Sequence, residues 1–291
     1  MTDQIRRHLE ALSQKDLPAR REAMVKILEE EGFPYTTQEA PSSFKNPQGV
    51  INYLFSAGDA PGLLFCAHYD AVAGSSGAND NAASVCILID LARELKDKQI
   101  SAHFAFFDAE ECKQAGSRLY ASSMDRNRIT GVVNLDMCGY GDTLVVCGKG
   151  HEKKAPVKAF CQKEILEKYN GQLLRYLPKS DDASFSGSRL PVLSMAVVPY
   201  WDIQYLKALA TYGGGFLGRP PEYDMMLGQM EVSATMHGGS KDAPEFVQTE
   251  AMDKVYHYLL DAVLTPQEQS QSGSGSTGSG LGSGLSRLFR S

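Results

Sequence analysis

The sequence predicts an α/β fold with a mixed, largely parallel central sheet and helices on both of its faces. Apolar runs such as HFAFFD at 103–108 and GVVNLDM at 131–137 are typical of buried strands. Segments with helical periodicity alternate with these runs, as in sheets whose strands are largely parallel. The length of 291 residues and the hydrophobic content of 43% suit one large domain.

The elements are expected in the following order. Helices come first, over 2–13 and 18–32, because Pro18 suits a first helical turn and Gly32-Phe33-Pro34 ends a helix. Apolar segments at 49–56 and 62–67 flank a Gly- and Pro-rich turn that is typical of a hairpin. The remaining expected elements are helices at 81–96, 114–125, 155–169 and 249–263 and strands at 103–108, 131–137, 143–148, 172–178 and 191–198.

Residues 199–232 fit neither the helical nor the strand period. They contain three consecutive glycines at 213–215, the pair Pro220-Pro221 and several aromatic side chains. Long irregular segments within a domain are usually functional, so we expect a loop or lid over a site. A surface excursion without a role is the alternative.

Charge and composition exclude several classes of protein. The net charge of −6 and the lack of a long basic run argue against a nucleic-acid partner. No apolar stretch reaches the roughly 18 residues that a membrane span needs, and the charged first residues do not resemble a secretory signal. We therefore expect a cytoplasmic protein, with free thiols at the six cysteines, 66, 86, 112, 138, 147 and 161.

Acidic residues and histidines recur along the chain in an order that suits a paired-metal site. A buried carboxylate is costly unless it is paired or binds a metal, and carboxylate with imidazole suits zinc. A two-zinc site needs a shared carboxylate, one histidine and one further carboxylate per ion, and a separate general base. The candidates are His68, Asp80, Glu110 with Glu111, Asp136 and His237.

Each candidate also has a simpler interpretation. Adjacent acids such as Glu110 and Glu111 favour the start of a helix, and Asp80 could cap the helix that follows it. His68 and His237 could be ordinary turn or loop histidines. Asp136, inside an apolar strand, is harder to explain without a ligand. For the other four histidines we expect structural or surface roles: His8, His103, His151 and His257.

Taken together, the strings H-x-D, G-A-x-D-N-A, D-A-E-E, N-L-D-M and M-H resemble the dinuclear zinc aminopeptidase family, over roughly residues 45–265. This family includes bacterial leucine aminopeptidases, glutamate carboxypeptidases and glutaminyl cyclases. The resemblance implies a metallopeptidase that binds two Zn²⁺ per chain and removes N-terminal residues from peptide substrates. It implies that Asp80 bridges the ions, that His68 and Asp136 bind one, and that Glu111 and His237 bind the other.

The resemblance also implies that Glu110 is the general base and that Asp70 orients His68. Two departures concern the surroundings of the site. Asp182 stands where the family often has a histidine near the substrate, and Asp242 follows the last histidine one residue later than usual. Related cyclases tend to carry Trp before that histidine, and Met236 here favours an aminopeptidase. A glutaminyl-cyclase-like transferase and a non-catalytic scaffold stay as alternatives.

The chain changes character near its end. Residues 1–266 are expected to form the catalytic domain, 267–284 a flexible Gly/Ser linker and 285–291 a short amphipathic tail. Such a tether and anchor resemble the cargo-targeting peptides of bacterial protein shells. We expect the tail to dock the enzyme onto a protein partner or shell rather than a membrane. A sequence added for expression is the alternative.

Overall fold

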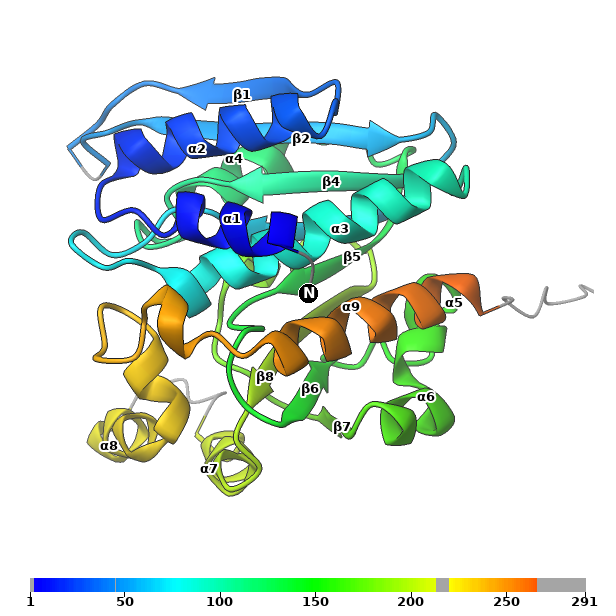
Figure 1. Cartoon of the computed structure of the whole chain (residues 1–291). Helices are drawn as coiled ribbons and strands as arrows, with labels where there is room; N and C mark the ends of the chain where they lie inside the picture. Colours follow the sequence, from blue (N-terminus) through cyan, green and yellow to red (C-terminus); the bar gives the residue numbers. More distant parts are fainter. Residues whose placement is uncertain (1–2, 45, 213–219, 266–291) are drawn as a thin grey trace, which may run out of the picture.

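An eight-stranded sheet runs through the computed structural model in the order β1-β2-β4-β3-β5-β8-β6-β7 (Figure 1). The structure describes residues 3–44, 46–212 and 220–265. The strands are β1 (Thr36–Ala40), β2 (Val50–Ala57), β3 (Gly62–His68), β4 (Ala102–Phe107), β5 (Ile129–Leu135), β6 (Thr143–Cys147), β7 (Gly171–Leu174) and β8 (Val192–Val198).

The centre of this sheet is parallel and its margins are mixed. Strand β3 pairs in parallel with β4 and β5, and β5 pairs in parallel with β8. Strands β1, β2 and β4 are antiparallel to one another in turn, as are β6 and β8, whereas β7 pairs in parallel with β6. The predicted mixed, largely parallel sheet is confirmed.

The hairpin expected between β2 and β3 is wrong, because β4 lies between them. A Cβ added to Gly58 would lie 2.6 Å from Ser101 Oγ, and one added to Gly62 would lie 2.5 Å from the Ser101 carbonyl oxygen. Glycine is therefore needed where the turn passes close to the start of β4. A Gly-rich turn therefore also occurs where the chain passes from one strand to another that is not its neighbour in the sheet.

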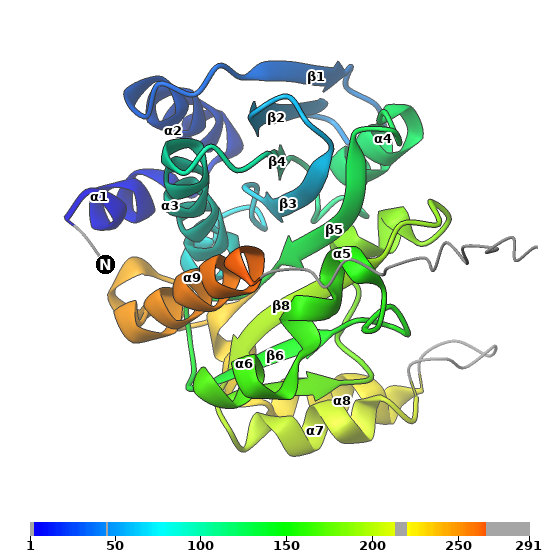
Figure 2. The same cartoon turned by 90° about the vertical axis from the view of Figure 1, so that its right-hand side faces the viewer.

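Helices cover both faces of the sheet (Figure 2). On one side lie α1 (Asp3–Leu12), α2 (Leu17–Glu30), α3 (Ala83–Asp97) and α9 (Thr249–Leu264), and on the other lies α4 (Ala115–Ser123). Successive strand residues alternate between faces: Phe65 and Ala67 of β3 pack in the core under α3 and α9, while Leu64 and Cys66 pack on the side of α4.

Three local expectations need correction. The edge strand β1 was not predicted, because its residues are polar and mostly exposed. The helix expected over 155–169 divides into α5 (Ala155–Lys158), a 3₁₀ turn (Ala159–Cys161) and α6 (Lys163–Lys168), where the Tyr258 hydroxyl of α9 donates to the Phe160 carbonyl. Segment 199–232 contains α7 (Asp202–Leu209) and α8 (Pro221–Gln229), which pack on β6 and β8.

Other expectations concern the thiols and the ends of the chain. All six cysteines are free, as predicted. Among the described helices, none combines the length and apolarity needed to cross a bilayer. The glycines at 213–215, the linker 267–284 and the tail 285–291 lie outside the described residues. The location of the protein and the docking role of the tail stay predictions.

Candidate metal centre

The carboxyl ends of three neighbouring strands bring most of the candidate residues together. His68 is the last residue of β3, Glu110 and Glu111 follow β4, and Asp136 follows β5. Asp80 comes from a π-helical turn (Ala78–Ala82) that leads into α3. His237 comes from the loop after a 3₁₀ turn (Glu231–Thr235). Strand ends thus bring candidate ligands together at one edge, where sites form in other open α/β sheets.

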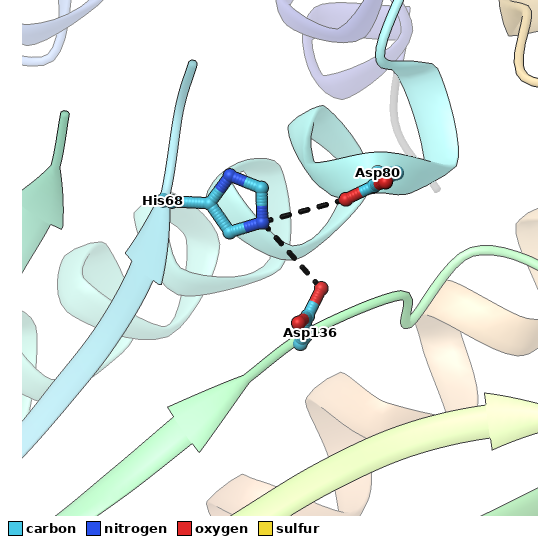
Figure 3. Close-up of side chains that lie close together, drawn as sticks. All are labelled: His68, Asp80 and Asp136. Atoms are coloured by element: carbon cyan, nitrogen blue, oxygen red, sulfur yellow. Dashed lines mark ion pairs between the residues drawn. The ribbon is translucent and has the colours of Figure 1, made fainter. Parts of the chain in front are cut away.

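The candidates form two three-residue groups that share Asp80. In the first, His68 Nε2 lies 3.4 Å from Asp80 Oδ1 and 3.6 Å from Asp136 Oδ1 (Figure 3). In the second, His237 Nε2 lies 3.8 Å from Asp80 Oδ2 and 3.8 Å from Glu111 Oε2. Asp80 thus presents one carboxylate oxygen to each group.

The residues of both groups fit divalent cations. Asp136 Oδ1 is buried and has no hydrogen-bond partner among the described residues, and an unsatisfied buried acceptor is costly. Imidazole nitrogen and carboxylate oxygen are the ligand atoms that zinc takes in proteins. An ion bound between His68, Asp80 and Asp136 would satisfy that oxygen.

Asp70 connects the segment after β3 to the segment after β4. Its carboxylate accepts hydrogen bonds from the backbone N–H groups of Glu110 at 3.0 Å and Glu111 at 3.2 Å. His68 Nδ1 lies 3.4 Å from Asp70 Oδ1 and 3.2 Å from the Asp70 carbonyl oxygen. These contacts leave Nε2 of His68 to face the first group.

Asp242 and Asp182, whose roles the sequence left open, belong to neither three-residue group. The Asp242 carboxylate accepts from the backbone N–H groups of Asn79 and Asp80 and from the Ser75 hydroxyl. It therefore holds the turn of Asp80 rather than His237. Asp182 is buried, forms an ion pair with Lys149 and accepts from the Ser180 N–H.

Burial and crowding of negative charge shift the titration of the cluster. Burial raises the pKa of Glu110 to about 8, and the pKa of Glu111 to about 8 with a contribution from Asp80. Burial alone would lower the pKa of His68, but the carboxylates of Asp136, Asp70 and Asp80 outweigh it and raise that pKa well above its usual range. A cation at the centre would relieve this repulsion.

Sequence reasoning missed two residues at the centre. Asp181 is fully buried, and neither carboxylate oxygen has a hydrogen-bond partner in the described part of the chain. Burial and the neighbouring Glu110 raise its pKa well above the usual range. Asn81 donates to the Leu135 carbonyl and accepts from the Met137 N–H, so it joins the turn of Asp80 to the end of β5. No periodicity marks either residue.

The backbone is strained beside the candidates. Ala109, Met137 and His237 adopt φ values of 55°, 59° and 50°, in the left-handed region that non-glycine residues seldom occupy. Each is one of the candidates or adjoins one. Such conformations cost free energy and persist only where the surrounding contacts impose them, as they often do at functional sites.

A pocket of about 170 Å³ opens beside the centre. Five of the candidates contribute to its lining: His68, Asp80, Glu110, Asp136 and His237. The rest of the lining is mostly apolar and comes mainly from β8, α7, α8 and the segments beside them; its side chains include Met137, Leu177, Val198, Leu206, Tyr223, Leu227, Met230, Val232 and Met236. The pocket thus combines the candidate metal ligands with apolar side chains.

With this geometry in view, comparison with known proteins identifies the family. The sequence profile described as peptidase family M28 matches residues 51–274. The chain belongs to peptidase family M28. This confirms the family predicted from the motifs, and it makes the chain a member of an enzyme family, as expected.

Individual relatives match this chain over only part of its length. The aminopeptidase YwaD of Bacillus subtilis is 33% identical over 138 residues, which are 45% of this chain and 26% of that protein. The chain thus spans about a quarter of the length of this curated relative. Because only this part of the relative is aligned, the activity of the present chain is inferred from its own candidate site.

Two solved structures share the fold. A zinc aminopeptidase of Bacillus subtilis superposes with a TM-score of 0.55 and 21% identity, over 75% of this chain and 50% of that chain. A glutaminyl cyclase of Porphyromonas gingivalis superposes with a TM-score of 0.63 and 15% identity, over 90% of this chain and 96% of that chain. At these identities the likeness shows the fold alone, and it confirms the predicted fold class.

Proposed function

We propose that this M28-family chain is a zinc-dependent aminopeptidase that removes N-terminal residues from peptides with the help of two zinc ions. The observation that carries the proposal is the pair of three-residue groups that share Asp80. A single buried histidine with one carboxylate would have many structural explanations. Two such groups, which use the two different oxygens of one carboxylate, have few explanations other than a metal site.

The proposed ligands follow from the two groups. His68, Asp136 and one oxygen of Asp80 would hold the first ion, and Glu111, His237 and the other oxygen of Asp80 would hold the second. Bound zinc supplies Lewis-acid polarisation of a carbonyl oxygen and activation of water near neutral pH. The zinc aminopeptidase of Bacillus subtilis, which has a similar fold, supports this choice of metal.

Glu110 is the proposed general base. It lines the pocket beside His68 and Asp136, and Gln114 Nε2 donates to its Oε1 at 2.8 Å. That hydrogen bond fixes one carboxylate oxygen, and we assign proton transfer to the other. The carboxylate takes a proton from the attacking water and delivers it to the nitrogen of the leaving amine.

The pocket gives the proposed substrate its orientation. The free α-amine of a peptide would bind at the proposed metal ligands, and the apolar side chains that line the pocket suit an uncharged side chain. An apolar cavity of about 150 Å³ is large enough for benzene. The pocket of about 170 Å³ can therefore take a branched aliphatic or a six-membered aromatic group. We propose a preference for leucine, methionine or phenylalanine at the N-terminus.

A panel of aminoacyl fluorogenic substrates with the zinc-loaded chain tests the proposal. Leucyl, methionyl and phenylalanyl substrates should react at least roughly tenfold faster than aspartyl or lysyl ones, since mismatched polarity in an apolar pocket costs more than 1 kcal/mol. An N-acetylated leucyl substrate is the matched control and should not react. Release of pyroglutamate from a glutaminyl peptide would instead favour the cyclase alternative. Inactivity on every substrate with zinc bound would favour the scaffold.

A further inference from the structure

The N-terminal helix α2 lies outside the region matched by the family profile, yet it contacts two of the loops that adjoin proposed ligands. Two consecutive arginines of this helix, Arg20 and Arg21, make these contacts. Successive helical residues point about 100° apart, so the two side chains reach different loops from one turn.

Arg20 reaches the loop that joins His68 to Asp80. Its side chain is 1% exposed, and it donates from Nε to the Tyr69 carbonyl at 2.5 Å, from Nη1 to the Ser76 carbonyl at 2.7 Å and from Nη2 to the Gly77 carbonyl at 3.3 Å. The guanidinium therefore spans the loop and holds its first and last residues together.

The loop is shaped to receive this guanidinium. A Cβ at Gly77 would lie 2.8 Å from Arg20 Nη1, 2.8 Å from the Asp80 carbonyl oxygen and 2.5 Å from the Ala71 side chain. Gly77 also has a φ of 54°, which favours glycine. Burial lowers the pKa of Arg20, while the carboxylates of Asp70, Asp242 and Asp80 act in the opposite direction.

Arg21 reaches the second loop through Asp108. It donates to Asp108 Oδ2 from Nε at 3.0 Å and from Nη2 at 2.6 Å, and Asp108 is fully buried. Asp108 directly precedes the strained Ala109 and the proposed base and ligand, Glu110 and Glu111. The ion pair thus fixes the point at which this loop leaves β4.

We infer that Arg20 and Arg21 are positioning residues, which hold the loop of residues 69–77 and the loop of residues 108–111 at the separation that the metal centre requires. The inference rests on the proposed metal centre. Asp70 links the two loops directly, since its carboxylate accepts from the backbone N–H groups of Glu110 and Glu111. The helix α2 is accordingly a component of the site, although it contributes no ligand.

Zinc affinity of the full-length chain, measured by competition with a chromogenic chelator, tests this role directly. Arg20→Met and Arg21→Met should each raise the zinc dissociation constant roughly 10–100-fold, as for other residues that orient metal ligands. Arg20→Lys keeps the charge but loses the planar fork of donors, so it should fall between wild type and Arg20→Met. If Arg20→Met does not fold, Arg20→Lys and Arg21→Met provide the same comparison.

Arg93→Met is the matched control. Arg93 makes a similar two-atom contact to the buried Glu31, at 2.9 and 2.7 Å, but it joins α3 to the end of α2 and touches neither loop. The Arg93→Met substitution should lower the thermal unfolding temperature, while zinc affinity stays within about twofold of wild type. Unchanged affinity in the Arg20 and Arg21 variants, an equal loss in Arg93→Met, or full affinity in Arg20→Lys would overturn the inference. Absence of zinc binding by the wild-type chain would instead overturn the metal centre itself.

Discussion

The two groups that share Asp80 differ in how firmly the fold holds them. His68 ends a central strand and is 1% exposed, and Asp70 occupies its second ring nitrogen. The His237 side chain is 56% exposed and comes from a loop. In the first group, packing sets the ligand positions before an ion binds. In the second, the loop must be ordered by its contact with Asp80, whose Oδ2 accepts from the His237 N–H at 3.1 Å.

This contrast suggests a division of roles. A buried histidine at a strand end suits tight retention of an ion, because little conformational entropy is lost on binding. An exposed histidine on a loop suits contact with substrate and exchange of an ion. We therefore expect the ion at Glu111 and His237 to leave first when zinc is removed with a chelator.

The largest effect is expected at the shared residue. Asp80→Ala removes one ligand from each group, so zinc content should fall from two equivalents to none. Loss of the Lewis-acid term, worth several kcal/mol, should lower kcat/KM by more than about a thousandfold. Metal analysis and steady-state kinetics check both numbers. Asp97→Ala, an exposed residue at the end of α3, is the control and should change neither. One tightly bound equivalent in Asp80→Ala would show that the groups are independent.

The next largest effect separates chemistry from metal binding. Glu110→Gln keeps the size and the hydrogen bond to Gln114 but cannot accept a proton, so kcat should fall about 10²–10⁴-fold. Zinc content should stay at two equivalents, since Glu110 belongs to neither group. Full peptidase activity with both ions bound would remove Glu110 from the mechanism.

A smaller effect compares the two histidines in the metal-free chain. His68→Ala leaves the buried carboxylate of Asp80 and the buried Oδ1 atom of Asp136 without their imidazole partner, which should cost about 1–3 kcal/mol of unfolding free energy. His237→Ala alters an exposed side chain and should stay within about 0.5 kcal/mol. Chemical denaturation measures both. Equal losses would contradict the contrast between a fixed and a mobile half.

Part of the candidate site was predictable from the sequence because three of its residues follow apolar strands. Strand ends in an α/β sheet meet at one edge, so His68, Glu110 and Asp136 could be expected together from the sequence alone. The sheet order was not predictable in the same way. The turn after β2 is rich in glycine whether the next strand pairs beside it or beyond it, and only the packing of Gly58 and Gly62 on Ser101 decides between them.

The supporting residues were the least predictable part of the site. Arg20 and Arg21 lie in an ordinary charged helix, 48 and 47 residues before His68, the first proposed ligand, and nothing in their spacing separates them from solvent-facing arginines. Asp181 directly precedes Asp182, and the departure from the family pattern in this string was assigned to Asp182 alone. Contacts of this kind join segments that are far apart in the sequence, so local sequence patterns do not predict them.

The smallest effect is expected from the C-terminal segment. Deletion of residues 267–291 should leave kcat, KM and zinc content within about twofold, because the proposed ligands lie between His68 and His237 in the sequence. The docking role proposed for this segment requires a separate measurement. The segment fused to an unrelated reporter should retain a partner protein from the native host, and the Leu288→Asp version should retain much less, since the apolar face of Leu285, Leu288 and Phe289 would be interrupted. Equal retention of both fusions would contradict docking through that face, whereas altered zinc content after deletion would show that the segment contributes to the metal centre.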